Sequence, residues 1–236
     1  SRQLKNGKVK ILSEWSHGGI AQGLKAAQIG APGLFSKQML GSDIMKYNPY
    51  VRMMQNPMRD DSDPVVFIPA LYPDVVFIHV QVADKYGNAC IYGPVVNDIA
   101  LASATRKVII TAEEIVPEIN LRYIKDGAII PFIYVDAVVE LPFGAVPGNM
   151  PGYYYWSRQW WEKLMRHATK DEEKFFEFFD EWVMRTKDQF EFVEKLGGTK
   201  WITEARRQTK AAEGSNEDID FRYQEYAPEN KTELYY

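Results

Sequence analysis

Three short stretches of the sequence carry residue types that acid–base or binding chemistry uses. The segment SEWSHGGIAQG (13–23) places Ser16 and His17 before two glycines at the expected start of a helix. Two adjacent carboxylates, Glu113 and Glu114, follow an apolar run, and either could transfer a proton. His79 lies inside another apolar run. Each stretch could also have a purely structural role, and the surrounding elements decide between the chemical and the structural interpretation.

The segment around His17 does not have the glycine spacing of a phosphate-binding loop, which is G-x-x-x-x-G-K-[ST] or G-x-G-x-x-G. Ser16 is instead a residue type that caps helix N-termini, and Gly18-Gly19 gives a flexible entry to the helix. Apolar residues at helical spacing predict this helix over residues 18–29, and Gly30 and Pro32 end it.

Glu113 and Glu114 come after a run that is typical of a buried strand. Sheets of α/β proteins bind ligands at the carboxyl ends of their strands, so one glutamate could act in acid–base catalysis. The alternative, which we favour, is a local cap or ion pair for one and solvation for the other. For His79 we favour a hydrogen-bonded core residue, because no second metal-binding residue has suitable spacing. His167, in a helical stretch, is expected at the surface.

Four β-branched runs predict the sheet that must position these residues. Runs that are apolar on both faces suit strands buried between helices, which indicates an α/β fold with an open, mostly parallel twisted sheet flanked by helices. The segment ADKYGN (83–88) has turn residues and predicts a hairpin. Residues 33–63 have no sustained period and are predicted to form a long functional loop. The four runs are VVFIP (65–69), VVFIHVQV (75–82), KVIIT (107–111) and YVDAVVEL (134–141).

The C-terminal region is predicted to be helical from Trp156 onward. TKDE (169–172) is a capping-box pattern, and Gly197 is a candidate C-cap. Seven residues between them form one predicted stripe: Phe175, Phe179, Trp182, Val183, Thr186, Phe190 and Val193. The aromatic segment 142–161 is expected to pack on its own core or in an interface rather than to stack on a ligand. We therefore expect one domain over 1–203 and an acidic, tyrosine-rich tail over 204–236, either disordered or bound to a partner.

Bulk composition narrows the function classes. A chain of 236 residues can bury a sizeable core, and its net charge of −4 argues against general nucleic-acid binding. No apolar run approaches the ~18 residues of a membrane-spanning helix. Cys90 is the only cysteine, which excludes an internal disulfide and a cysteine-based zinc site. These features predict a cytoplasmic protein without membrane, nucleic-acid or metal ligands.

Four segments together, in their order and spacing, resemble the α subunit of family I CoA-transferases, closest to the glutaconate CoA-transferase type. The similarity covers most of residues 7–202, and it implies the fold shared by CoA-transferase and ribose-5-phosphate isomerase-like domains. Subunits of this type begin with a further strand and helix, so the sequence is expected to lack that N-terminal part. The segments are YPDVVFIHVQVADKYGN (72–88), KVIITAEEIV (107–116), YVDAVVELPFGAVPG (134–148) and FEFVEKLGG (190–198).

The resemblance implies that the partner is a β subunit, in an α2β2 assembly with the active site at the αβ interface. A glutamate of the β subunit would attack an acyl-CoA thioester and form first an acyl-glutamyl anhydride and then a glutamyl-CoA thioester. CoA then passes to a small organic or dicarboxylic acid. Coenzyme A, or its acyl thioester, is thus expected as substrate, and no metal is expected.

The resemblance also points to residues of this chain. LGSD (40–43) matches a Gly-Ser turn of the family, which makes Gly41 and Ser42 candidate acyl-pocket residues together with Ser16. His17 is the candidate catalytic residue, because an imidazole with an unperturbed pKa of ~6.5 can orient a carboxylate or act as a base. The ring-opening hydrolase branch reads roughly Asp-Glu-Gly where this chain has Ser16-His17-Gly18, which argues against that activity. A hydrolase, a decarboxylase of the same family and a non-catalytic structural subunit remain the alternatives.

Overall fold

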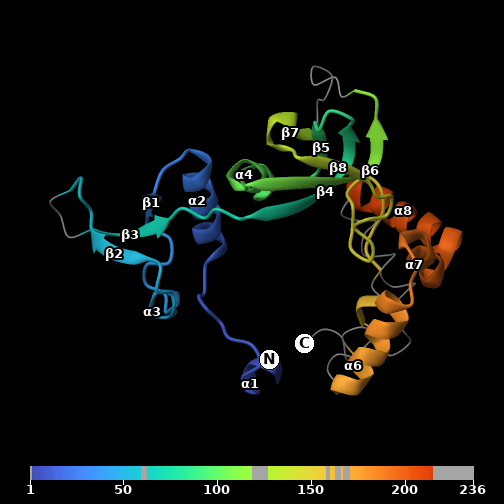
Figure 1. Ribbon diagram of the computed structural model, residues 1–236, viewed down its shortest axis with the longest axis horizontal. Coiled ribbons are helices and arrows are strands. Elements are labelled where there is room, and N and C mark those ends of the chain that lie inside the picture. Colours follow the sequence, from blue (N-terminus) through green and yellow to red (C-terminus); the bar gives the residue numbers. More distant parts are fainter. Residues whose placement is uncertain are drawn as a thin grey trace. The chain divides into compact units, whose positions relative to one another are not determined.

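The computed structural model describes residues 2–59, 63–118, 127–157, 160–162, 166 and 171–214 (Figure 1). The chain forms two compact units. The first consists of Ser1–Ile78, Val95–Ile109 and Ile133–Asp136, and the second of His79–Pro94, Ile110–Phe132 and Ala137–Tyr236. Two long strands, β4 (Val75–Asp84) and β6 (Lys107–Val116), begin in the first unit and end in the second.

The first unit is built around a three-stranded antiparallel sheet of order β1-β3-β2. One face of β3 is fully buried through Val66 and Ile68, which pack with Met39 and Val51. Helix α2 contacts β1, β3 and α4. The elements are α1 (Arg2–Lys5), α2 (His17–Gln28), β1 (Gly33–Ser36), α3 (Ile44–Tyr47), β2 (Arg52–Gln55), β3 (Pro64–Pro69) and α4 (Asp98–Ala104).

Two sequence predictions for this unit have opposite outcomes. The helix predicted over residues 18–29 is confirmed as α2. The long loop predicted over residues 33–63 is wrong, because that segment contains β1, β2 and α3. The strands were not predicted because each is only four residues long and β2 is exposed along its length, which leaves no apolar alternation.

The second sheet has the order β7-β5-β4-β6-β8 and adds β5 (Ala89–Tyr92), β7 (Gly127–Ile130) and β8 (Ala137–Glu140). Its strands β4, β6 and β8 run parallel. The Lys107 N–H donates to the Asp74 carbonyl at 3.0 Å, and the Leu141 N–H donates to the Ala112 carbonyl at 2.8 Å. Strand β5 pairs antiparallel with both β4 and β7. The predicted α/β fold with a mostly parallel sheet flanked by helices is confirmed.

The predicted hairpin at 83–88 is confirmed between β4 and β5. Asp84 is fully buried, and its carboxylate accepts the N–H groups of Tyr86 and Asn88, each at 2.9 Å. Gly87 has φ +105°, a value that glycine adopts without the steric cost of a Cβ atom. These contacts fix the register of β5 against β4 and thereby the buried position of Cys90.

The C-terminal helices of the second unit are α6 (Glu172–Phe179), the π-helical turn η3 (Asp180–Met184), α7 (Gln189–Leu196) and α8 (Gly198–Gly214). A 3-10 turn, η2 (Phe132–Tyr134), lies earlier in the chain. The predicted capping box is corrected, because the N-cap is Asp171, whose side chain accepts from the Lys174 N–H. Thr169 and His167 lie outside the described residues. The predicted cap at Gly197 is confirmed by its φ of +122°.

The predicted apolar stripe is wrong in part. Phe178, Trp182, Phe192 and Val193 are the buried residues, whereas Phe175, Phe179 and Phe190 are 36%, 39% and 59% exposed. The π-helical turn and the break at residues 185–188 change the helical phase, so one stripe cannot run from α6 through α7. The predicted packing of the aromatic segment is confirmed, since its buried residues join the helices in one cluster: Val146, Met150, Tyr154, Phe178, Trp182, Phe192 and Ala205.

Helix α8 crosses the expected domain boundary after residue 203 without interruption. Residues 215–236 lie outside the described part of the chain, so the predicted tail stays a prediction. Within the described residues, no helix combines the length and hydropathy needed to cross a membrane.

Candidate functional site

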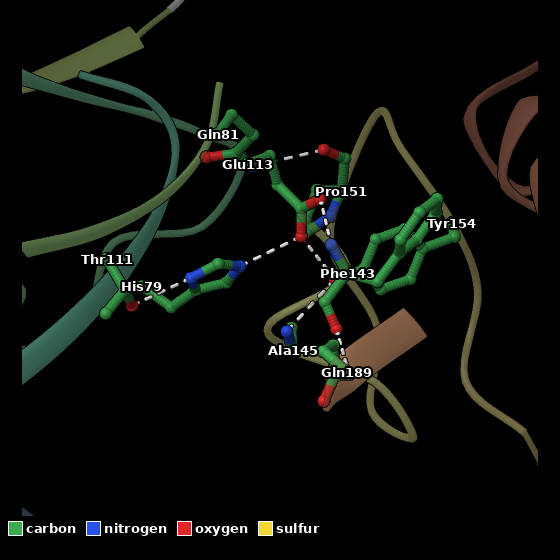
Figure 2. Close-up of polar contacts among 9 residues, drawn as sticks. All are labelled: His79, Gln81, Thr111, Glu113, Phe143, Ala145, Pro151, Tyr154 and Gln189. Atoms are coloured by element: carbon green, nitrogen blue, oxygen red, sulfur yellow. Dashed lines mark hydrogen bonds and ion pairs between the residues drawn. The ribbon is translucent and has the colours of Figure 1, made fainter. Parts of the chain in front are cut away.

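Glu113 and His79 meet between the adjacent strands β6 and β4 in the second unit (Figure 2). His79 Nε2 lies 2.8 Å from Glu113 Oε1, and His79 Nδ1 lies 2.9 Å from Thr111 Oγ1. Glu113 does not follow the strand, as the sequence suggested, but lies inside it, because β6 continues to Val116. It is only 8% exposed, whereas Glu114 is exposed. The interpretation of His79 as a hydrogen-bonded core residue is confirmed.

Glu113 accepts hydrogen bonds at both oxygens. The Tyr154 hydroxyl donates to Oε1, and the Phe143 N–H donates to Oε2 at 2.7 Å. Burial raises the pKa of the Tyr154 hydroxyl far above its usual value, and the hydrogen bond to Glu113 raises it further, so this hydroxyl is a neutral donor. His79 Nε2 makes a third polar contact with this carboxyl group, at 2.8 Å from Oε1.

The turn at residues 141–148 is fixed by the same network. Phe143 has a left-handed φ of +62°, and a Cβ atom on Gly144 would lie 2.6 Å from His79 Cε1. The Ala145 N–H donates to the Tyr154 hydroxyl at 3.0 Å, and Gln189 Nε2 of α7 donates to the Phe143 carbonyl at 2.5 Å. The network therefore joins β4, β6, this turn and α7.

The backbone donors of this turn are all used internally. The N–H groups of Gly144 and Val146 donate to Leu141 and Phe143 carbonyls, each at 3.0 Å, and those of Phe143 and Ala145 are used by the network. An oxyanion site needs free N–H groups aimed at the developing charge. From Phe143 to Val146 none is free, which makes the network a positioning element for the fold rather than a site for a substrate oxyanion.

Two polar residues of this region were not singled out from the sequence. Gln81, 1% exposed, donates to the Tyr92 carbonyl at 2.8 Å and to the Pro151 carbonyl at 3.0 Å. Tyr154 was treated only as part of an aromatic segment. A glutamine among the β-branched residues of a buried strand was the available signal, since such a side chain needs partners.

The residues predicted from the resemblance all lie in the first unit. Ser16 caps α2, because its Oγ accepts the Gly19 N–H at 3.0 Å. His17 is the first residue of α2 and is exposed, with Nε2 3.4 Å from Asn97 Nδ2. Ser42 Oγ donates to the Met39 carbonyl at 2.8 Å. Gly41 has φ +75°, and its Cβ direction is open for 4 Å.

The start of α2 lies against the loop that carries Gly41 and Ser42. A Cβ atom on Gly18 would lie 2.6 Å from Gln38 Oε1, and one on Gly19 would lie 3.2 Å from Met39 Cε. The four predicted residues thus lie on two segments that approach each other at Gly18 and Gln38 and at Gly19 and Met39. Among the described residues, no cluster of three or more His, Cys, Asp or Glu side chains is placed to hold a metal ion.

Comparison with known proteins supports the resemblance. The sequence model of the Coenzyme A transferase family matches residues 1–141. The chain is 30% identical over 192 residues to the A subunit of 3-oxoadipate CoA-transferase from Pseudomonas knackmussii, covering 80% of this chain and 65% of that protein. The crystal structure of glutaconate coenzyme A-transferase from Acidaminococcus fermentans superimposes with a TM-score of 0.75 at 30% identity, over 85% of this chain and 67% of the other.

Similar proteins with other activities also exist. The cholesterol ring-cleaving hydrolase IpdA subunit of Rhodococcus jostii is 26% identical over 77% of this chain and 64% of its own length. The crystal structure of a variant of the decarboxylase AibA/AibB superimposes with a TM-score of 0.65 at 26% identity, over 78% of this chain and 65% of that one.

The chain spans 45% to 65% of the length of the curated relatives that it matches. The family match nevertheless includes both segments around His17 and Ser42, together with β4 and β6. On the sequence match and the shared fold, the chain belongs to the Coenzyme A transferase family.

Proposed function

We propose that this chain is the α subunit of a heteromeric CoA-transferase, which moves CoA from an acyl-CoA thioester to a small carboxylic or dicarboxylic acid. The observation that carries the proposal is the family match over residues 1–141, which includes both segments of the candidate pocket. The partner is a β subunit, in an α2β2 assembly. We place the enzyme in the cytoplasm, since its single cysteine suits a reducing compartment.

In this proposal the nucleophile is a glutamate of the β subunit. Its carboxylate attacks the acyl-CoA carbonyl, CoA leaves as a thiolate, and an acyl-glutamyl anhydride remains. The thiolate then attacks the glutamyl carbonyl of the anhydride, which releases the donor acid and leaves a glutamyl-CoA thioester. The acceptor carboxylate reverses these two steps and leaves with CoA. A carboxylate is a suitable nucleophile here because its adduct is as activated as the substrate.

The α subunit contributes the acyl side of the pocket in this proposal, through Ser16, His17, Gly41 and Ser42. Support comes from the contact of Gly18 with Gln38 and from the exposed position of His17. The open Cβ direction at Gly41 leaves space for a ligand next to the Ser42 side chain. His17 would orient the substrate carboxylate or take up a proton, which are the two roles that an imidazole serves near neutral pH.

The second candidate function is hydrolysis or decarboxylation of a CoA thioester. The similarity to the decarboxylase and to the ring-cleaving hydrolase favours it. An assay of both subunits with acyl-CoA, with and without an acceptor acid, separates the candidates. A transferase consumes acyl-CoA only when acceptor is present and makes acceptor-CoA. Without acceptor, free CoA supports thioester hydrolysis, and release of CO2 with a shorter acyl-CoA supports decarboxylation; either result contradicts the transferase.

A variant tests the role of His17. We expect His17→Ala, assayed with the β subunit, to lower kcat/KM for transfer by about 100-fold or more, because the loss of a proton-transferring group costs at least roughly this factor. Asn97→Ala serves as the control, since it removes the neighbour of His17 at 3.4 Å but leaves the imidazole in place. Unchanged kcat and acyl-CoA KM in His17→Ala would remove this residue from the proposed pocket.

A non-catalytic structural subunit is the third alternative. It predicts that adding the β subunit to this chain produces no activity beyond that of the isolated β subunit. Activity that requires both chains contradicts it.

A further inference from the structure

Some apolar side chains of the helix α6 and the turn η3 are buried in the core of the second unit, and others remain exposed. Phe178 and Trp182 fill the core side and are 3% and 7% exposed. Beside them lies a second set, called here the phenylalanine stripe, which remains at the surface. It consists of Phe175, Phe176, Phe179 and Val183, exposed by 36%, 57%, 39% and 47%.

Three rings of the phenylalanine stripe form a contiguous surface, because the Phe175 ring centroid lies 5.8 Å from that of Phe176 and 6.3 Å from that of Phe179. Val183, the fourth member, is exposed in the π-helical turn that follows α6. Single exposed apolar residues are common on proteins, but clusters of them mark interaction surfaces, and aromatic residues are enriched in such surfaces. The stripe therefore has the composition of a protein-binding surface.

The charges around the phenylalanine stripe restrict its partner. Residues 172–185 contain five carboxylates and two cationic side chains, a net charge of −3. Glu173, Glu177 and Glu181 are exposed on the same helical segment. A second copy of this chain would bring a like-charged border against this one, which is unfavourable. The complementary surface is apolar in its centre and has lysine and arginine at its border.

We propose that the phenylalanine stripe binds the β subunit, through an apolar surface of that subunit bordered by cationic side chains. This inference rests on the proposed function, which requires a protein partner. It adds the place of contact and the chemistry of the partner surface. Burial of the rings supplies the affinity, and the opposite charges speed association and exclude a second copy.

The test measures binding of the full chain to the purified β subunit by calorimetry. We expect the double variant Phe176→Ser/Val183→Ser to bind at least about 10-fold more weakly, the effect of removing a contact worth ~1.4 kcal/mol. The control is Phe132→Ser, which changes a phenylalanine of nearly the same exposure, 58% against 57%, outside the stripe. Its affinity should equal that of the wild type.

A second pair of variants tests the charged border. Glu177→Lys should weaken binding and reduce the dependence of affinity on salt, because it replaces an attraction by a repulsion. Glu118→Lys, an exposed glutamate outside the helix, is the matched control and should leave both quantities unchanged.

Four results would overturn the docking surface. They are wild-type affinity in the stripe variants, no binding of the β subunit by the wild type, self-association of the chain that the stripe variants abolish, and a thermal midpoint that falls by more than about 4 °C in the double variant, a destabilisation that substitutions on an exposed surface would not cause. Transfer activity is a separate readout. If the complex forms through the stripe but has no transfer activity, the proposed transferase function is wrong. If the complex is active and the stripe variants bind with wild-type affinity, only the proposed docking surface is wrong.

Discussion

Glu113 is hydrogen-bonded to three separate parts of the second unit: His79 of β4, the Phe143 N–H of the turn and the Tyr154 hydroxyl. Each contact links an element to β6, so the carboxylate holds the sheet, the turn and α7 in one arrangement. Removing the acceptor from such a network leaves buried donors without a partner, which costs more than the hydrogen bonds themselves contribute.

We therefore predict that Glu113→Gln lowers the free energy of unfolding by about 2–4 kcal/mol, because the amide NH2 must face one of the donors. Glu114→Gln is a matched control on the adjacent, exposed position and should change stability by less than about 0.5 kcal/mol. Urea unfolding at pH 7 measures both. Equal losses in the two variants would show that the buried network is not what Glu113 provides.

The sequence could not predict this network. It showed two adjacent glutamates and could not tell which one faces the core, since that depends on the register of β6 against β4. The partners of Glu113 lie 34, 30 and 41 residues away along the chain. Contacts of this kind follow from the assembled sheet and not from local spacing. The prediction that His79 is a hydrogen-bonded core residue rested only on its apolar neighbours in the sequence, and it was confirmed.

At the level of elements, the cap of α2 connects local structure to the proposed pocket. Ser16 has two roles in this account, the observed cap of Gly19 N–H and the proposed lining of the acyl site. Substitutions can separate them, because aspartate caps a helix as well as serine does.

We predict that Ser16→Ala lowers the free energy of unfolding by about 1 kcal/mol and that Ser16→Asp leaves it unchanged within about 0.5 kcal/mol. If Ser16 also lines the pocket, Ser16→Asp should still raise KM for acyl-CoA, since it adds a carboxylate there. Thermal unfolding and transfer kinetics measure the two effects. A loss of stability in the aspartate variant equal to that in the alanine variant would contradict the capping role.

The elements themselves were predictable to different degrees. The helix at residues 18–29 and the hairpin at 83–88 carry their own signals, which are a cap, an apolar period and turn residues. The strands β1 and β2 exist only because β3 pairs with both of them, a long-range contact with no local signal. The stripe in the C-terminal helices had the right period but the wrong phase after the π-helical turn.

At the scale of the whole molecule, Cys90 reports on the integrity of the second unit. It is fully buried on β5, and burial raises the pKa of its thiol. Both effects reduce the thiolate that reagents attack. We predict that the native protein reacts with a disulfide reagent at pH 8 at least about 100-fold more slowly than the unfolded chain, because reaction must await opening of the sheet. Reaction at the same rate in the two states would contradict the burial of β5.

The fold and the family follow from the chain itself, whereas the proposed activity requires the proposed complex with a β subunit. In the proposed reaction, CoA passes to a carboxylate without the participation of water. Each step proposed above exchanges oxygen only among the carboxylates of the donor acid, the enzyme and the acceptor. Hydrolysis of the thioester instead adds one oxygen atom from water to the released acid.

The most direct test is therefore the reaction of acyl-CoA and an acceptor acid, with both subunits present, in water enriched in oxygen-18. Mass spectrometry of the products measures the label in the released donor acid. The proposed mechanism predicts formation of acceptor-CoA and a donor acid that carries no oxygen from the solvent. One solvent oxygen in the released acid, with CoA left free, would contradict the transferase and establish hydrolysis.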